Sequence, residues 1–181
     1  DSTQIKSVDN QGTFDPENPD IRFAIAPDLE SDEFKNWFKQ SKAVDADGNP
    51  IRLFHASDAV RTEFENRPDH NGGNLIPGAH YFTDDKAETE SFGEAVTEAY
   101  LSLQNPYILD YDTEEGMARV ERLEEIEPGV DVIEILRAEG YDGAIFTGSG
   151  DWVMKEYVAF DSEQIKSVDN QGTFDPENPD I

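Results

Sequence analysis

One carboxylate in the sequence stands where the local pattern does not require it. Glu156 precedes the apolar run 157–160, in which aromatic or β-branched residues alternate with smaller ones, and this alternation predicts a β-strand. A carboxylate at the start of such a strand is half sheltered from water. It could stabilise positive charge in a reaction, or it could be an edge-strand charge that discourages aggregation.

A histidine stands near the end of a second predicted strand, residues 51–57. His55 is followed there by Ala56 and Ser57. A single histidine at a strand end is usually structural. Two small residues directly after it, however, let a ligand approach the backbone closely.

A tyrosine lies in a third predicted strand, residues 80–83, at position 81. The segment before it, residues 58–79, is rich in Gly, Asn and Pro and is long enough to form a lid over a site. Arg61 and Arg67 are the arginines of this segment.

The composition narrows the classes of protein. The chain has 181 residues, 41 acidic and 14 basic residues, a formal net charge of −27 and no cysteine. Its length suits one domain with a real core. The negative charge repels nucleic-acid backbones, which argues against a general DNA-binding role. It also repels dinucleotides at long range, so any dinucleotide site must rely on local arginines. The lack of cysteine excludes disulfides, thiolate metal sites and a cysteine nucleophile. No apolar stretch is long enough to cross a bilayer, so we expect no membrane partner.

Residues 1–21 and 161–181 are the same sequence except for Thr3 against Glu163. The offset of 160 residues predicts a tandem array with a unit of about that length, so we expect neighbouring copies of the unit in a longer chain. The predicted domains are the tail of a preceding unit plus a linker (1–30), one folded domain (31–168), and a Pro- and Asn-rich tail (169–181) that repeats residues 9–21.

The remaining patterns predict helices between the strands. Apolar periodicity and capping residues indicate helices that begin at Ser31, begin at 84–85 and continue through Ala95, and cover 117–126 and 132–136. Further strands are expected over 99–103, closed by Asn105-Pro106, over 142–146, and shortly after residue 160. The sum is a mixed α+β domain of short strands with peripheral helices.

Residues 44–51 predict a hairpin turn. The Asp-x-Asp-Gly-Asn sequence that begins at Asp45 is also similar to the start of a calcium loop. The glutamate expected at the twelfth position of such a loop is missing. An acidic, calcium-dependent surface repeat therefore stays as a minor alternative, and no metal is expected.

Three blocks in order, His-Ala-Ser at 55–57, Tyr-Phe-Thr at 81–83 and Glu-Tyr-Val-Ala-Phe at 156–160, resemble the His-Tyr-Glu branch of the ADP-ribosyltransferase superfamily. The wider frame is most similar to the ADP-ribosyltransferase modules of phage and mobile-element polyvalent proteins, over roughly residues 31–181. The blocks that carry this similarity are 34–38, 41–45, 100–106, 140–143, 164–167 and 172–181. The resemblance implies a split β-sandwich with peripheral helices.

The resemblance also implies roles for the residues in these blocks. Glu156 would stabilise the cation-like ribose and bind its 2′-hydroxyl, and His55 would hold the adenosine ribose. Tyr81 and Phe92 would stack on the nicotinamide ring of NAD. The remaining expected NAD contacts are the Ala56 backbone and Thr89 to the carboxamide, Ser57 beside them, and Arg61 to the pyrophosphate.

The chain departs from the family pattern at three positions. Ala56 stands where glycine is common, which tightens the approach to the carboxamide, and Phe92 replaces a commoner tyrosine, which keeps the stacking surface without the hydroxyl. Met154 is neither Glu nor Gln, so the arginine-directed subtype is not indicated.

The expected function is therefore NAD-dependent mono-ADP-ribosyl transfer to a macromolecular acceptor, a protein rather than a nucleic acid. A catalytically degenerate module that binds a nucleotide or a partner within a tandem polyprotein is the alternative. The resemblance implies action in a bacterial cytoplasm, native or phage-delivered, and the sequence leaves secretion open.

Overall fold

Seven β-strands form one hydrogen-bonded sheet in the computed structural model, which describes residues 28–59, 61, 63–65, 74–150, 155–170 and 174. The strands are β1 (Leu53–Ser57), β2 (His80–Thr83), β3 (Ala95–Leu101), β4 (Pro106–Asp110), β5 (Gly143–Thr147), β6 (Glu156–Ala159) and β7 (Ile165–Ser167). Their order is β4-β5-β6-β2-β1-β3-β7, with β4 and β5 parallel and the other neighbours antiparallel.

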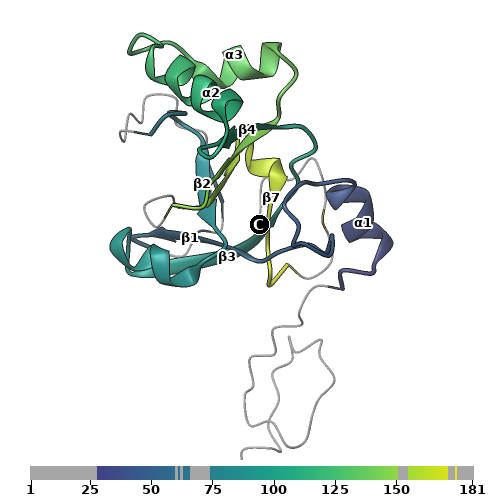
Figure 1. The fold of residues 1–181 in the computed structure, drawn as a ribbon. Helices are drawn as coiled ribbons and strands as arrows, with labels where there is room; N and C mark the ends of the chain where they lie inside the picture. The colour runs from purple at the N-terminus through teal and green to yellow at the C-terminus, as the bar shows by residue number, and fades with distance from the viewer. Residues whose placement is uncertain are drawn as a thin grey trace, which may run out of the picture.

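The sheet is nearly divided between β1 and β2. These strands share one register pair, Phe54 with Thr83, whereas β1 pairs with β3 over the whole of its length, from Leu53 to Ser57. Figure 1 shows β1 and β3 running at a steep angle to β2. The α+β fold with a split sheet, expected from the sequence, is therefore confirmed.

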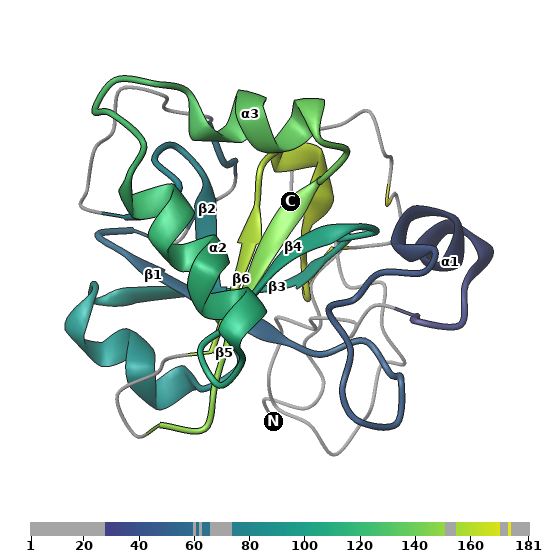
Figure 2. The same ribbon diagram turned by 45° about the horizontal axis from the view of Figure 1, so that its top comes forward.

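Three α-helices in the described part of the chain cover the sheet. They are α1 (Asp32–Phe38), α2 (Glu114–Glu124) and α3 (Val132–Ala138). The short 3₁₀ helix η2 (Lys86–Ser91) lies between β2 and β3, and η3 (Ser162–Gln164) lies between β6 and β7. Each α-helix begins at a polar cap whose side chain accepts a backbone N–H: Ser31, Thr113 and Asp131. Figure 2 shows α2 and α3 together over the β4-β5-β6 part of the sheet, with α1 apart from them.

Three groups of buried side chains hold these layers together. One joins α2 and α3 to β4, β5 and β6, and it includes Leu123, Leu136 and Phe146. A second lies between the two parts of the sheet and includes Leu53, Phe82 and Tyr157. Since β5 and β6 contribute to both groups, these central strands are buried on both faces, as their continuous apolar sequences require.

The third group lies under α1 and is mainly aromatic. It contains Phe34, Trp37, Phe38, Tyr100, Val168 and Phe174. Phe34, Trp37 and Phe38 fall on one face of α1, which confirms the apolar stripe expected from their spacing. Phe174 is 2% exposed, so the packing of the domain includes a residue beyond position 168.

Two expectations about secondary structure are wrong. No strand was expected after Pro106, yet β4 begins there; proline fits because it is the first residue of a strand at the sheet edge. The helix after Asp85 does not reach Ala95 but ends at Ser91, and β3 begins at Ala95 instead of residue 99.

The backbone that follows η2 lies close against the end of β1 at Gly93. A Cβ atom at this position would lie 2.4 Å from the carbonyl oxygen of Ser57, so the backbone after η2 touches the backbone at the end of β1. This contact fixes η2 beside β1.

We expect Gly93→Ala to lower the melting temperature by roughly 5 °C or more, because the clash is with backbone and neither segment can move cheaply. Thermal unfolding followed by circular dichroism measures this. Ser91→Ala, an exposed change in the same segment, is the control and should leave the melting temperature nearly unchanged. A Gly93→Ala protein as stable as this control would contradict the close contact.

Candidate active site

A cavity of about 390 Å³ lies where the sheet divides, within the size range of small-molecule sites. It is lined by residues from β1, β2, η2 and the start of β6, and by the segment after β1. The lining residues are Phe54, His55, Ala56, Arg61, Glu63, Phe64, Glu65, Asn74, Gly78, Ala79, His80, Tyr81, Phe82, Thr83, Thr89, Phe92 and Glu156. Segments separated by up to a hundred residues therefore meet here.

All of the site residues named from the sequence line this cavity except Ser57. Ser57 is 9% exposed, and its hydroxyl donates to the carbonyl of Ala59 (2.7 Å) and accepts from Nε of Arg61 (3.3 Å). The backbone N–H of Arg61 donates to the hydroxyl of Thr97 (3.0 Å). Ser57 therefore orients Arg61 instead of facing the cavity. Of the expected lid, residues 60, 62 and 66–73, including Arg67, lie outside the described residues.

The imidazole of His55 is held on three sides. Its ring centroid lies 5.0 Å from that of Phe64 and 5.3 Å from that of Phe82, and its Nδ1 lies 2.8 Å from the carbonyl oxygen of Tyr81. Burial lowers the pKa of His55; the bond to Tyr81 opposes this shift, and the charge of Arg61 adds to it.

His55 is accordingly neutral at pH 7, and its tautomer follows from its partner. Because the carbonyl of Tyr81 can only accept, the proton is assigned to Nδ1, which leaves Nε2 as an acceptor. A neutral acceptor suits a hydroxyl group, such as that of a ribose, better than a phosphate.

The phenol of Tyr81 is fixed by the backbone of Ile76. Its oxygen accepts from the N–H of Ile76 (3.0 Å) and lies 3.4 Å from the carbonyl of the same residue. The ring centroids of Tyr81 and Phe146 lie 6.1 Å apart. Burial raises the pKa of Tyr81 well above its ordinary value, so the phenol stays protonated. Tyr81 thus offers a fixed aromatic surface to the cavity.

Thr89 and Phe92 lie at the end of η2 and differ in exposure. Thr89 is 3% exposed, and its hydroxyl donates to the carbonyl of Lys86 (2.7 Å), which leaves its oxygen able to accept. Phe92 is 61% exposed, although it lines the cavity. A large aromatic ring exposed at a cavity wall is a surface on which a planar ligand can stack.

Glu156 is the first residue of β6 and lies opposite Thr83 of β2. Among the described residues, none donates a hydrogen bond to its carboxylate or forms an ion pair with it. Burial is the main cause that raises the pKa of Glu156 from its ordinary 4.5 to about 7, and the charge of Glu88 adds to it. A carboxylate without a partner in a cavity is poised to meet positive charge on a ligand.

Sequence reasoning did not single out Glu88 or Phe64. The carboxylate of Glu88 accepts from the hydroxyl of Thr83 (2.7 Å), which holds its charge near Glu156. Glu88 lies in the 3₁₀ helix η2, whereas the sequence predicted an α-helix there and gave no signal for this bond. Phe64 is 5% exposed and packs on His55, but it lies in a segment with no periodicity.

The remaining expectations concern metals and membranes. The carboxylate of Asp45 accepts from the backbone of Asp47 (2.9 Å) and Asn49 (2.8 Å), which accounts for the Asp-x-Asp-Gly-Asn sequence as a turn. Within the part of the chain that the structure describes, no group of three His, Asp or Glu side chains is arranged to hold a metal ion. No described helix is long and apolar enough to span a bilayer.

A split α+β sheet with a cavity at the split fits the class of ADP-ribosyltransferase domains. The sequence model of the family described as "ADP-Ribosyltransferase in polyvalent proteins" matches residues 45–174, more than two thirds of the chain. The chain belongs to this family. None of the curated proteins matches it. The solved structures include a match to "Crystal structure of an anti-CRISPR protein", with 14% identity, a TM-score of 0.37, and coverage of 61% of this chain and 89% of that chain.

The buried carboxylate should cost stability when it is ionised. The unfolded chain loses the proton of Glu156 near pH 4.5 and the folded chain near pH 7, so the folded state weakens as the pH rises between these values. Glu156→Gln removes this effect. We therefore expect its melting temperature, relative to that of the unchanged protein, to be higher at pH 8 than at pH 5.

Differential scanning fluorimetry at the two pH values measures this difference. Glu121→Gln removes an exposed carboxylate on α2 and controls for the general loss of one negative charge. The same pH dependence in both variants would show that Glu156 is not specifically destabilised by burial.

Proposed function

We propose that this domain is a NAD-dependent mono-ADP-ribosyltransferase that moves ADP-ribose from NAD to a macromolecular acceptor and releases nicotinamide. The observation that carries the proposal is the meeting of His55, Tyr81 and Glu156, from three strands, around one cavity. Membership in the ADP-ribosyltransferase family supports the same reaction class.

The chemistry explains the need for an ionised carboxylate. The bond between the nicotinamide nitrogen and C1′ of the ribose breaks, and its electron pair leaves with nicotinamide. The sugar becomes cation-like, as in glycoside cleavage, and the acceptor then bonds to C1′ and loses its proton. Glu156 stabilises charge that is present mainly in the transition state. A charge pair about 4 Å apart at an effective dielectric near 20 contributes roughly 4 kcal/mol.

The side chains around the cavity suit the parts of NAD. Neutral His55 can accept from a ribose hydroxyl, and Tyr81 and exposed Phe92 offer aromatic surfaces to the nicotinamide ring. Thr89 and the Ala56 backbone are the proposed carboxamide contacts. Arg61, oriented by Ser57, is the proposed pyrophosphate contact, so Ser57 acts through Arg61.

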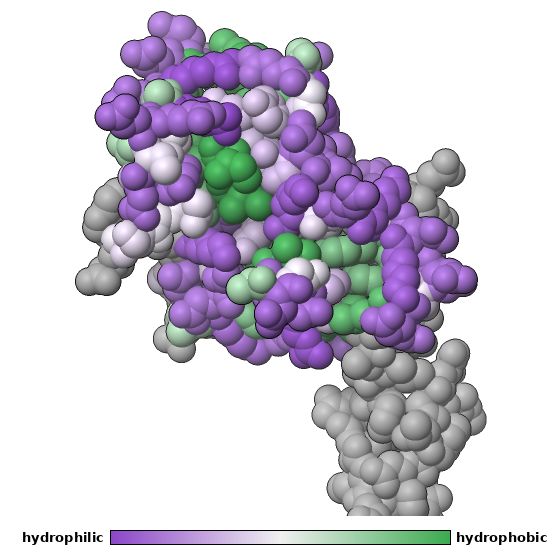
Figure 3. Space-filling model, turned by 45° about the vertical axis from the view of Figure 1, so that its right-hand side comes forward, coloured by the Kyte–Doolittle hydropathy of each residue, from purple (hydrophilic) through white to green (hydrophobic). Residues whose placement is uncertain are grey.

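Electrostatics limits the affinity for NAD. Glu63 and Glu65 line the cavity together with Glu156, while Arg61 is the one cation among the described lining residues. The wider surface is acidic as well, and hydrophilic side chains dominate the face in Figure 3. An anionic dinucleotide should therefore bind weakly, and its binding should strengthen as salt screens the repulsion.

The acidic surface also favours a protein acceptor over a nucleic acid, because it repels a phosphate backbone. Transfer of a single ADP-ribose is proposed because no second sugar-acceptor site is marked in the sequence. A degenerate module, suggested by the repeated segment, is the competing function: it would bind NAD or a partner without releasing nicotinamide.

Glu156→Gln is expected to reduce transfer and NAD hydrolysis about a thousandfold, which is roughly 4 kcal/mol at 1.4 kcal/mol per decade. NAD affinity, measured by calorimetry, should change by no more than a few-fold, because the lost interaction acts mainly in the transition state. Release of nicotinamide from labelled NAD measures turnover, with Glu121→Gln as the charge-matched control. Turnover near that of the unchanged protein would exclude the role of Glu156.

The pH profile tests the ionised form separately. Because Glu156 must be ionised and its pKa is about 7, kcat/KM should fall about tenfold per pH unit below 7 and level off above it. Glu88→Gln removes the neighbouring negative charge, lowers the pKa of Glu156, and should move the midpoint to lower pH. A midpoint that stays in place in this variant would assign the titration to another group.

A further inference from the structure

The C-terminal segment of the domain, residues 161–174, of which 161–170 and 174 are described, lies in a groove between α1 and β3. We call this surface the tail groove; its described walls are Phe34, Trp37, Phe38, Glu98–Ser102 and Asp142. The segment enters as η3, continues as β7 at the edge of the sheet, and ends at Phe174 under α1.

Backbone hydrogen bonds fix the segment along the groove. β7 pairs with β3 so that Ser167 lies opposite Ala99 and Ile165 opposite Leu101. At either end of this ladder, the N–H of Ser102 donates to the carbonyl of residue 164 (2.9 Å) and the N–H of residue 168 to the carbonyl of Glu98 (3.0 Å). The indole N–H of Trp37 donates to the carbonyl of Glu163 (2.9 Å).

Gln164 fixes the register of the segment through its side chain. Its amide oxygen accepts from the backbone N–H groups of Phe160 (3.0 Å) and Asp161 (2.9 Å). Its amide nitrogen donates to the carbonyls of Ser102 (3.1 Å) and Asp142 (2.8 Å). Both donors and both acceptor positions of the amide are used, so a shift of one residue would break four bonds.

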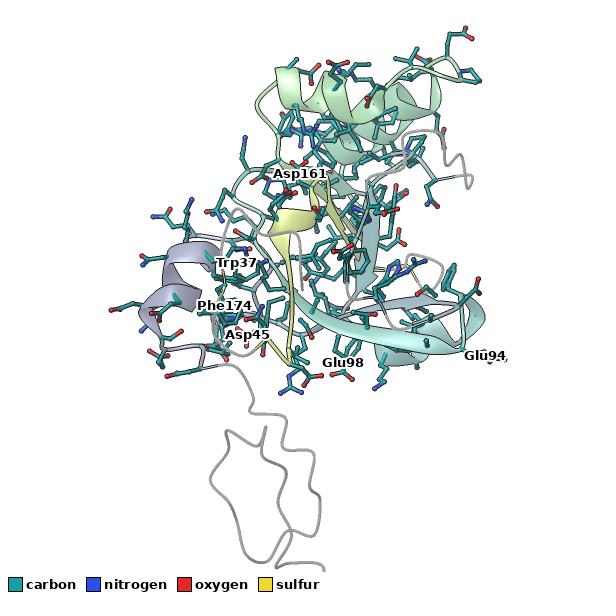
Figure 4. All side chains as sticks on the ribbon, turned by 180° about the vertical axis from the view of Figure 1, so that it is seen from behind. Trp37, Asp45, Glu94, Glu98, Asp161 and Phe174 are labelled. Carbon is teal, nitrogen blue, oxygen red and sulfur yellow. The ribbon has the colours of Figure 1, made fainter. Side chains whose placement is uncertain are left out.

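Apolar burial adds to these bonds at both ends of the segment. Ile165 is 0% and Phe174 2% exposed. The ring centroid of Phe174 lies 5.1 Å from Phe34 and 5.7 Å from Trp37, and Figure 4 shows Trp37 and Phe174 side by side at α1. The segment is therefore part of the folded core.

The N-terminal copy of the segment carries every side chain that makes these contacts. Gln4, Ile5, Lys6, Val8 and Phe14 correspond to Gln164, Ile165, Lys166, Val168 and Phe174. The one difference is Thr3 in place of Glu163. Glu163 meets Trp37 through its backbone carbonyl, and its side chain accepts a bond from the adjacent Ser162 (3.2 Å), so threonine can replace it without loss of the contact to α1.

The connection between the N-terminal copy and the groove is long enough. Seventeen residues, 15–31, separate Phe14 from α1, and an extended chain spans about 3.3 Å per residue, or roughly 55 Å here. Phe14 would take the place of Phe174, whose ring centroid lies 5.1 Å from that of Phe34 in α1. The connection is much longer than this distance, so it can join the two positions within one chain without strain.

We propose that residues 1–14 are a second occupant of the tail groove and can replace residues 161–174 of the same chain. The domain is then complete with its last segment supplied from either end, as in a circular permutation. In a tandem array, the tail of one unit can complete the unit that follows it. This inference does not depend on the proposed enzymatic function.

A double-mutant cycle on the full chain tests the exchange. Phe14→Ala alone should leave the melting temperature within about 1 °C, because the C-terminal copy is intact. Phe174→Ala alone should lower it only by a few degrees, because the N-terminal copy takes over. The double variant should lose roughly 10 °C, as expected when a buried phenylalanine has no replacement. Equal melting temperatures for Phe174→Ala and the double variant would overturn the proposal.

A disulfide trap reports the exchange directly, since the chain has no cysteine of its own. Ser7 corresponds to Ser167, which lies opposite Ala99. In the Phe174→Ala background, Ala99→Cys with Ser7→Cys should form a disulfide within one chain, detected by peptide mass mapping; Ala99→Cys with Ser167→Cys is the matched control. A disulfide that joins position 7 of one chain to position 99 of another would overturn replacement within the same chain.

Discussion

The division of the sheet between β1 and β2 is the constraint on which the rest of the domain depends. One register pair joins the two parts, so the strands separate where His55, Tyr81 and Glu156 lie. A continuous ladder would bring β1 and β2 together and close the cavity. The bond between His55 and the Tyr81 carbonyl spans this same junction, and it joins the strands where backbone pairing stops. The division of the sheet therefore accounts both for the cavity and for the position of His55 in its wall.

The separation has an electrostatic consequence. Glu156 lies opposite Thr83 at the start of β6, sheltered enough to raise its pKa, and Thr83 also holds Glu88 nearby. Two carboxylates in one region repel each other in the free protein. A ligand that carries or develops positive charge would relieve this repulsion, which is the electrostatic basis of the proposed catalytic role of Glu156. Among the described residues, no cationic side chain pairs with Glu156, so nothing offsets the effect of burial and of Glu88 on its pKa.

The sequence predicted those parts of the fold that have local signals. Ser31 and the apolar stripe after it predicted α1, and β-branched or aromatic runs predicted β1, β2, β5, β6 and β7. It did not predict β4, because proline argues against a strand except at its first residue on an edge. It also did not predict the close contact between Gly93 after η2 and Ser57 at the end of β1, which are distant in sequence. Tertiary contacts of this kind have no local pattern.

In the candidate site, too, the residues with a sequence motif were predicted and those that depend on tertiary contacts were not. The blocks around His55, Tyr81 and Glu156 were found as motifs, and the structure gathers them at one cavity. Ser57 was named for its place in a motif, yet its hydroxyl accepts a bond from Arg61 and orients it. Glu88 was missed because its effect on Glu156 depends on a tertiary contact with Thr83. The catalytic roles of His55, Tyr81 and Glu156 stay predictions.

For the repeated segment, the composition indicates a linker, whereas the packing of Phe174 indicates part of the folded domain. Gly, Pro and Asn in residues 169–181 are typical of a linker, and this pattern placed the segment outside the folded domain. Phe174 is nevertheless buried among the aromatic rings under α1. One anchoring ring, together with the β7 ladder and the amide of Gln164, is enough to hold a segment whose other residues have turn-forming sequences. Residues 1–14 carry the same anchoring side chains, which is why we propose that either copy can occupy the tail groove.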